Sequence, residues 1–349
     1  MRYLIEISQR QATEIAKLIN ERKYQNVAQF ITTAIENQIY IENSDEAQVC
    51  VRVEEKNLNG LLMSNNALMD TNKINKLSGI KNQPQTVSMP AFHDLSASLC
   101  DSEEENCWLW GQVNKILPIK IGLRVLLLKL ETEKWIDLEE YKDDAASIAA
   151  NIGTAIKKYE NKRGKTRGER ISAGLPEEKG EKSKNRYKSH FLAYIRKDEK
   201  LDGAMPFLRF VNLNKNEKSK VFIGLTEAGL EFARLQNPVL DNSNYEKSFT
   251  EKEVNFYLQH IVSKARGESC AVEWLLKKIV NGMTEREKIN NELKRDFGEI
   301  WSASDAVINT QRAGLMARMF ELGLIEKKKM GVRVFYNISE KGKIFLEKL

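Results

Sequence analysis

The chain opens with residues 1–42, which read MRYLIEISQRQATEIAKLINERKYQNVAQFITTAIENQIYIE. Apolar and polar residues alternate over residues 2–7, and this period of two predicts a short strand. One face of that strand carries Tyr3, Ile5 and Ile7, and the other carries Arg2, Leu4 and Glu6. A lone strand has no partner within this stretch, so we expect it to pair with the same strand of a second chain.

Two short helices are predicted to follow the strand. Ser8 and Gln11 have the spacing of a capping box, and an apolar stripe at helical period continues to Glu21. Asn26 is the expected N-cap of the second helix, whose stripe runs through Ile39. Because two short helices bury little apolar surface, this unit is expected to be stable only as an intertwined dimer.

This strand–helix–helix order resembles the ribbon-helix-helix family of DNA-binding proteins. Residues 24–35, YQNVAQFITTAI, stand where that family has its second-helix signature. The resemblance implies that the outward strand face reads the major groove and that the start of the second helix holds a phosphate. The residues implied in DNA binding are Arg2, Leu4, Glu6, Asn26 and Val27.

The charge of this opening unit departs from that family. Residues 1–43 contain five Lys or Arg and five Glu, so they carry no net charge. Neutralised phosphates supply much of the affinity for DNA. The alternative is that residues 1–43 only dimerise the chain.

The positive charge of the whole chain is localised. The net charge is +6 over 349 residues, with a pI near 8.9. Residues 44–106 are polar and acidic without sustained periodicity, which predicts a partly flexible linker. Residues 157–188, in contrast, hold twelve Lys or Arg and five Glu. Such a segregated basic segment is typical of a nucleic-acid footprint.

Two further domains are predicted after the linker. For residues 107–240 the pattern predicts helices over Ile119–Leu130 and Ala145–Tyr159, the basic insert 157–188 as a loop, and strands over Phe207–Val211 and Val221–Leu225. For residues 248–349 it predicts helices that begin at Thr250, Ala271, Thr284 and Ser302, a hairpin over Lys327–Arg333, a strand over Val334–Ile338 and a short final helix.

The two domains share their closing sequence at a constant offset of 113 residues. The first copy has Val221, Phe222, Leu225, Thr226, Glu227, Gly229 and Phe232, and the second has Val334, Phe335, Ile338, Ser339, Glu340, Gly342 and Phe345. The pattern predicts a strand, a Thr or Ser N-cap, and a helix whose Phe returns to the core. Two copies indicate a duplicated architecture.

Helices followed by a basic hairpin and this closing helix resemble winged-helix proteins, which are relatives of the helix-turn-helix class. The resemblance implies that Ser302–Ile325 contains the recognition helix, with Asn309 and Arg312 toward DNA, and that Lys327, Lys328, Lys329 and Arg333 lie in the wing. The first domain matches less well, and its candidate contacts are Asn151, Thr154, Lys157 and Lys158. A winged helix that binds protein, with the Lys run as a solvated turn, is the alternative.

Several function classes are disfavoured by the sequence. It contains no phosphate-binding glycine loop, dinucleotide fingerprint or HExxH motif, so no enzyme activity and no cofactor are expected. The acids between Asp137 and Asp144 surround a helix start, where the dipole favours them over a nuclease site. His93, Cys100 and Cys107 recur every seven residues, but zinc ligands pair at shorter spacing, so no metal is expected. The lack of a long apolar run predicts no membrane contact and a cytoplasmic location.

The sequence therefore predicts a mainly α protein with small β elements, built from a ribbon-helix-helix motif and two winged-helix-like domains. The expected function is that of a homodimeric, sequence-specific transcription regulator of a prokaryotic cytoplasm, with double-stranded DNA as its partner. Two alternatives remain: a plasmid or viral partition or replication-initiation protein that binds repeated sites, and a non-enzymatic adaptor whose winged helices bind protein.

Overall fold

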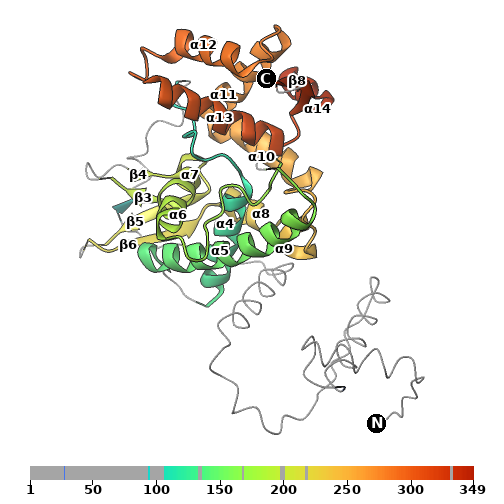
Figure 1. Ribbon diagram of the computed structural model, residues 1–349. Helices are drawn as coiled ribbons and strands as arrows, with labels where there is room; N and C mark the ends of the chain where they lie inside the picture. Colours follow the sequence, from blue (N-terminus) through green and yellow to red (C-terminus); the bar gives the residue numbers. More distant parts are fainter. Residues whose placement is uncertain are drawn as a thin grey trace, which may run out of the picture. The chain divides into compact units, whose positions relative to one another are not determined.

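The computed structural model describes residues 93–94, 106–132, 136–166, 169–196, 201–216, 219–330 and 333–349, together with Val27. The chain divides into two compact units, Met1–Met63 and Ser64–Leu349. The ribbon-helix-helix prediction falls outside the described residues, apart from Val27. The described part of Ser64–Leu349 is mainly helical with short strands, which confirms the coarse fold class (Figure 1).

The first module comprises residues 117–234 and is built on two long helices. Its elements are α4 (Leu117–Thr132), β2 (Ile136–Asp137), α5 (Leu138–Lys162), α6 (Glu181–Arg186), the π-helix η2 (Tyr187–Leu192), β3 (Tyr194–Ile195), β4 (Leu201–Asp202), α7 (Ala204–Phe207), β5 (Val211–Lys215), β6 (Val221–Leu225) and α8 (Glu227–Arg234). Asp137 caps α5 by accepting a hydrogen bond from the Glu140 amide, and Glu139 and Glu140 lie in the first turn. The acids at this helix start therefore have the predicted structural role.

A small antiparallel sheet closes the first module. Its strand order is β1-β5-β6-β2, where β1 is His93–Asp94. Strands β5 and β6 pair from Val211↔Leu225 to Lys215↔Val221, and β2 pairs with the outer side of β6 through Asp137↔Phe222. The hairpin β5–β6 thus packs against α4 and α5 through β6.

The second module comprises residues 266–349. Its elements are α11 (Arg266–Val280), α12 (Arg286–Phe297), α13 (Asp305–Glu321), β7 (Ile325–Met330), β8 (Arg333–Ile338) and α14 (Glu340–Leu346). The hairpin register runs from Ile325↔Ile338 to Met330↔Arg333, and a single bridge joins Glu285 to Phe335. Two helices connect the modules, α9 (Pro238–Asn242) and α10 (Glu251–Lys264), and α10 carries the predicted Thr250–Glu253 capping box.

The two modules repeat one backbone arrangement. Asp137↔Phe222 in the first module matches Glu285↔Phe335 in the second, so a segment before the second helix pairs with the same point of the hairpin in each copy. Thr226 and Ser339 cap the closing helices by accepting hydrogen bonds of 3.0 Å from the Gly229 and Gly342 amides.

The approach of each closing helix to its hairpin is also repeated. The amide nitrogens of Thr226 and Ser339 donate to the carbonyl oxygens of Phe210 and Leu324, each over 3.0 Å. A Cβ atom at Gly229 or Gly342 would overlap those same carbonyl groups, so both positions require glycine. The predicted duplication is therefore present in the geometry as well as in the sequence.

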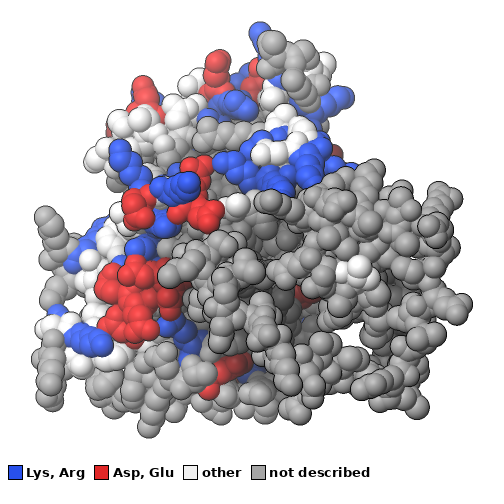
Figure 2. Space-filling view, turned by 60° about the horizontal axis from the view of Figure 1, so that its bottom comes forward, with Lys and Arg blue, Asp and Glu red and all other residues white. Residues whose placement is uncertain are grey.

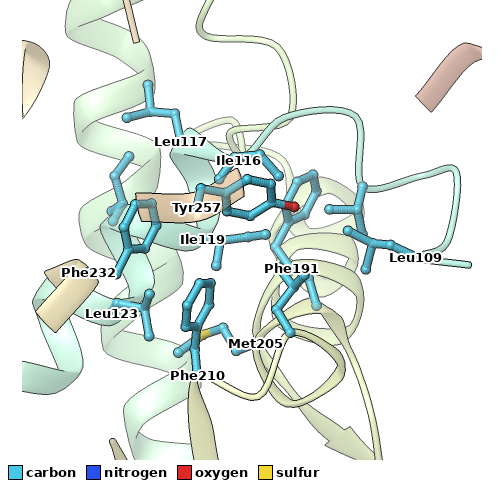
Figure 3. Packing of buried hydrophobic residues seen from close by; sticks show 14 of the residues in the cluster. Leu109, Ile116, Leu117, Ile119, Leu123, Phe191, Met205, Phe210, Phe232 and Tyr257 are labelled. Atoms are coloured by element: carbon cyan, nitrogen blue, oxygen red, sulfur yellow. The ribbon is translucent and has the colours of Figure 1, made fainter. Parts of the chain in front are cut away.

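One hydrophobic core runs through both modules. Figure 3 shows Phe191, Met205, Phe210 and Phe232 of the first module packed in one cluster with Tyr257 of α10. Two buried ion pairs lie beside this core, Lys120–Glu253 at 3.0 Å and Arg124–Asp241 at 2.8 Å. Burial lowers the pKa of Lys120 to about 7, although Glu253 opposes the shift. Buried pairs of this kind fix the relative position of the elements that carry them.

Residues 106–116, which we call the strap, precede the first module but pack along the second. The Trp108 ring lies among Trp274, Phe297 and Trp301, with centroid distances of 5.5, 4.5 and 5.1 Å. Further along, Gly111 contacts α13 so closely that a Cβ at Gly314 would overlap the Gly111 carbonyl group. The strap therefore covers one face of α13.

Several predicted element boundaries are wrong. The apolar run 207–211 is not a strand: α7 ends at Phe207, Arg209 has φ 57°, and β5 begins at Val211, because the Phe210 amide donates back to the Met205 carbonyl. The insert 157–188 is not all loop, since α5 continues to Lys162 and α6 occupies Glu181–Arg186.

The predicted starts of α12 and α13 are also wrong. Thr284 does not cap α12, because its carbonyl accepts a bond from the Tyr336 amide in the strand bridge, and Glu285 is the N-cap residue. Ser302 does not begin α13: it has φ 47°, and Ser304 is the N-cap residue.

Candidate nucleic-acid interface

The hairpin β7–β8 presents the predicted basic residues of the second module. Lys327 lies opposite Tyr336 and Lys328 opposite Phe335, and Lys329 pairs with Val334 just before the turn. Lys328 is exposed, and the Arg333 side chain is 74% exposed with its guanidinium 4.0 Å from Glu285. The predicted hairpin is confirmed, and the side chains of Lys328 and Arg333 face solvent.

Lys327 differs from these two because it turns toward the body of the module. Its Nζ lies 3.8 Å from the centroid of the Phe320 ring, so α13 supports the stem of the side chain. Burial lowers the pKa of Lys327 to about 8, and the positive charges of Lys115 and Arg286 lower it further, while Glu169 opposes them. Burial is therefore the main cause of the shift in the pKa of Lys327, and an excess of nearby positive charge adds to it.

That excess comes from side chains on four separate segments. Lys115 is on the strap, Arg286 opens α12, Arg312 is on α13 and Lys327 is on β7. Burial lowers the pKa of Arg312, Tyr336 opposes that shift, and the charge of Arg286 makes a smaller contribution in the direction of burial. We call Lys115, Arg286, Arg312 and Lys327 the basic cluster. Like charges that converge in this way are stabilised by an anion placed against them.

The two predicted DNA contacts on α13, Asn309 and Arg312, differ in their exposure to solvent. Asn309 is exposed, and its Oδ1 accepts a 2.7 Å hydrogen bond from Asn290 of α12. Arg312 is half-buried, and its Nε donates over 2.7 Å to the Oδ1 of the same Asn290. Arg312 thus holds α12 against α13, whereas Asn309 remains at the surface beside the exposed Ala306 and Ala313.

The strap limits which face of α13 is open. The Arg318 guanidinium donates to the Val113 carbonyl over 2.5 Å, and the Gln311 amide donates to the Leu109 carbonyl over 3.5 Å. The side of α13 that holds Gln311, Gly314 and Arg318 is therefore occupied. The sequence alone did not predict this packing. Gly111 and Gly314 are the residues that allow the close approach of the two backbones, but nothing in the sequence pairs them.

The candidate residues of the first module lie on α5. Thr154, Lys157 and Lys158 are exposed and Asn151 is half-buried, so they follow the polar side of that helix as predicted. Lys157 forms a 3.1 Å ion pair with Glu177 of the insert. The structure brings Thr154 and Lys157 together with Lys165, Arg170 and Arg186 around one cleft of about 610 Å³.

The N-terminal candidates Arg2, Leu4, Glu6 and Asn26 lie outside the described residues. Val27 is helical and exposed. The structure thus groups its candidates into a hairpin set, an α13 set and an α5 set. Sequence reasoning did not identify Lys115, Arg286, Arg170 or Arg186, because their importance depends on contacts between segments far apart in the chain.

The charged side chains are not evenly mixed on the surface. On the face shown in Figure 2, Lys and Arg side chains lie among Asp and Glu side chains in several places, and one larger group of each sign stands out. Among the described residues, no three His, Cys, Asp or Glu side chains are grouped as a metal site would require. None of the described helices is both long and apolar enough to cross a membrane.

Comparisons with models of protein families, with characterised proteins and with solved structures find no significant match to this chain.

Proposed function

We propose that the protein is a homodimeric DNA-binding protein, in which residues 1–43 form a ribbon-helix-helix dimer and each module of the described part is a winged helix. The repeated order of helix, strand bridge, helix, helix, hairpin and closing helix supports the winged-helix assignment. In this arrangement, α13 is the recognition helix and β7–β8 is the wing.

The observation that carries the proposal is the basic cluster at the foot of the hairpin. Its members come from four segments, and the pKa of Lys327 is lowered by burial and by its like-charged neighbours. Lys115 is only 4% exposed and lies near the buried Glu321, so Arg286 and Lys327, which reach the surface, are the members that would contact a DNA phosphate. The exposed Lys328 and Arg333 extend the same positive surface along the wing.

The open face of α13 carries the exposed Asp305, Ala306, Asn309 and Ala313, and the Asn309 amide bonds to Asn290 and to the Asp305 carbonyl, bonds that a base would have to replace. An Asn can read an adenine edge in the major groove, while small neighbours such as Ala306 and Ala313 let the helix approach the bases. In this proposal, few side chains of α13 select the DNA sequence. Contacts between basic side chains and DNA phosphates supply most of the affinity.

A transcription regulator is the simplest form of this function. The alternative is a plasmid or viral partition or replication-initiation protein, for which two DNA-binding modules in one chain would suit repeated sites. The adaptor hypothesis requires that the same modules bind protein and not DNA.

One experiment separates these functions. The full-length protein is mixed with genomic fragments, the bound fragments are recovered and footprinted, and affinity is measured by fluorescence anisotropy between about 50 and 200 mM salt. Affinity that falls steeply with salt at inverted repeats supports the regulator, and tandem repeats support the partition or initiation protein. An absence of binding at the lowest salt would contradict both and leave the adaptor.

A further inference from the structure

A cleft of about 610 Å³ opens on the first module, between α5, residues 165–166 and 170–178, and the strap. Gly153, Thr154 and Lys157 of α5 form one wall, and Arg170 and Arg186 lie across from them. Asn114 of the strap also lines the cleft. Its volume is within the usual range for small-molecule sites.

The loop that forms the far wall is fixed by buried contacts. The carboxylate of Glu160, which is fully buried, accepts hydrogen bonds from the amides of Ile171 and Ser172 over 2.6 and 3.3 Å. Lys165 forms a 3.1 Å ion pair with Glu246. The cleft is therefore held open by the fold, which reduces the entropy lost when a ligand binds.

Two guanidinium groups face this cleft without a carboxylate partner among the described residues. The Arg170 guanidinium donates to the Asn161 side chain over 2.8 Å and to the Lys165 carbonyl over 3.2 Å, and neither acceptor is charged. The Arg186 side chain is exposed and makes no hydrogen bond or ion pair within the described part of the chain. Guanidinium groups bind phosphate and carboxylate groups in a bidentate manner.

Asn114 lies on the inner side of the cleft. Its Oδ1 atom is buried, has no hydrogen-bond partner among the described residues and packs against Gly174. Because this atom is closed off from solvent, it belongs to the wall of the cleft, and recognition of an oxyanion falls to Arg170 and Arg186.

The acids of the cleft favour a small ligand over a stretch of DNA. Glu177 and Glu178 line the cleft and are exposed, so they lie at its rim. Their charges repel a continuous phosphate backbone, whereas a small molecule can lie inside them against Arg170 and Arg186. We infer that this cleft binds a small phosphate-bearing molecule of about nucleotide size.

The position of the cleft connects it to the basic cluster. Asn114 lines the cleft, and the next residue, Lys115, belongs to the cluster. Glu169, next to Arg170, acts electrostatically on Lys327. A negatively charged ligand beside Arg170 therefore lies next to Glu169 and alters the electrostatic surroundings of the cluster. This coupling rests on the proposed DNA binding, and by linkage DNA would change ligand affinity by the same factor.

Isothermal titration calorimetry on the full-length protein without DNA tests the binding directly. AMP and inorganic phosphate are the probes, and succinate is the carboxylate control. We expect saturable binding of AMP, weaker binding of phosphate, and at least a tenfold loss of AMP affinity in Arg186→Gln, which removes an exposed side chain. Arg186→Lys should retain part of the affinity. Arg295→Gln, an exposed arginine on α12, is the matched control and should bind AMP normally.

Three results would overturn the inference. They are an absence of saturable binding of either phosphate probe, equal AMP affinity in Arg186→Gln, and tighter binding of succinate than of AMP. If the protein binds no AMP and Arg186→Gln lowers its affinity for DNA, the cleft is instead part of the surface that contacts DNA. Because the calorimetry contains no DNA, a failure of the proposed DNA binding leaves this test intact.

Discussion

Arg318 and Glu268 meet inside the second module, where the guanidinium donates hydrogen bonds of 2.8 and 2.9 Å to the two carboxylate oxygens. The third guanidinium nitrogen donates to the Val113 carbonyl of the strap. Burial raises the pKa of Glu268, and the charge of Arg318 opposes that shift. One buried side chain thus joins α11, α13 and the strap.

Breaking this pair should destabilise the protein strongly. Glu268→Gln leaves the buried Arg318 charge without its partner, and we expect the free energy of unfolding to fall by about 3 kcal/mol. Urea denaturation followed by tryptophan fluorescence measures the change. The double variant Glu268→Leu, Arg318→Leu should lose less than the two single changes together. Lys343→Ala, which removes an exposed ion pair with Glu340, should change stability by less than about 0.5 kcal/mol.

The repeated caps should be similar in energy. Thr226→Ala and Ser339→Ala each remove the side-chain oxygen that accepts the Gly229 or Gly342 amide, so each should cost about 1 kcal/mol. Thermal or urea unfolding measures both losses. Thr310→Ala is the control, because its hydroxyl donates only to a carbonyl within α13. If only one of the two substitutions lowers the free energy of unfolding, the two caps do not stabilise their modules equally despite their matching geometry.

Charge reversal in the wing should weaken DNA binding on all sequences alike. Replacement of Lys328, Lys329 and Arg333 by Glu removes cations that are candidates to neutralise phosphates. The slope of log affinity against log salt should then become shallower by roughly 0.9 for each phosphate that is no longer neutralised. Lys277→Glu is the control, since Lys277 is an exposed lysine on α11, away from the wing. Unchanged affinity in the triple variant would remove the wing from the interface.

DNA affinity should also depend on pH through Lys327. Its pKa is about 8 in the free protein, so its charge is present below that pH and is lost as the pH rises through it. A bound phosphate favours the charged form and raises this pKa. Affinity should therefore decrease between about pH 7 and 9 more steeply than in Lys327→Met, which keeps the apolar stem. Parallel pH profiles for the two proteins would exclude Lys327 as a phosphate contact.

Local signals in the sequence predicted much of the described fold. The Thr250–Glu253 capping box, the hairpin between Lys327 and Arg333, and the paired endings at Thr226 and Ser339 all depend on residues close together in the chain. Such contacts can be read directly from spacing. The coarse class, mainly α with small β, follows from them.

The errors occur where distant contacts decide the structure. Thr284 has the spacing of a helix cap, but its backbone pairs with Tyr336, more than fifty residues away. The apolar run at Phe207–Val211 predicted a strand, yet a turn at Arg209 buries both Leu208 and Phe210 without one. The basic cluster could not be predicted because Lys115 and Lys327 meet only when the strap lies along α13.

The strap also has a consequence for how the chain is made. The Arg318–Val113 hydrogen bond joins residues 205 positions apart, so ribosomes synthesise the strap long before they complete the groove that receives it. Until residues 274–301 emerge, Trp108 lacks Trp274, Phe297 and Trp301 as neighbours. Nascent chains that stop before α11 therefore expose this indole and are expected to recruit chaperones or aggregate, which makes premature termination more harmful here than in two independently folding modules.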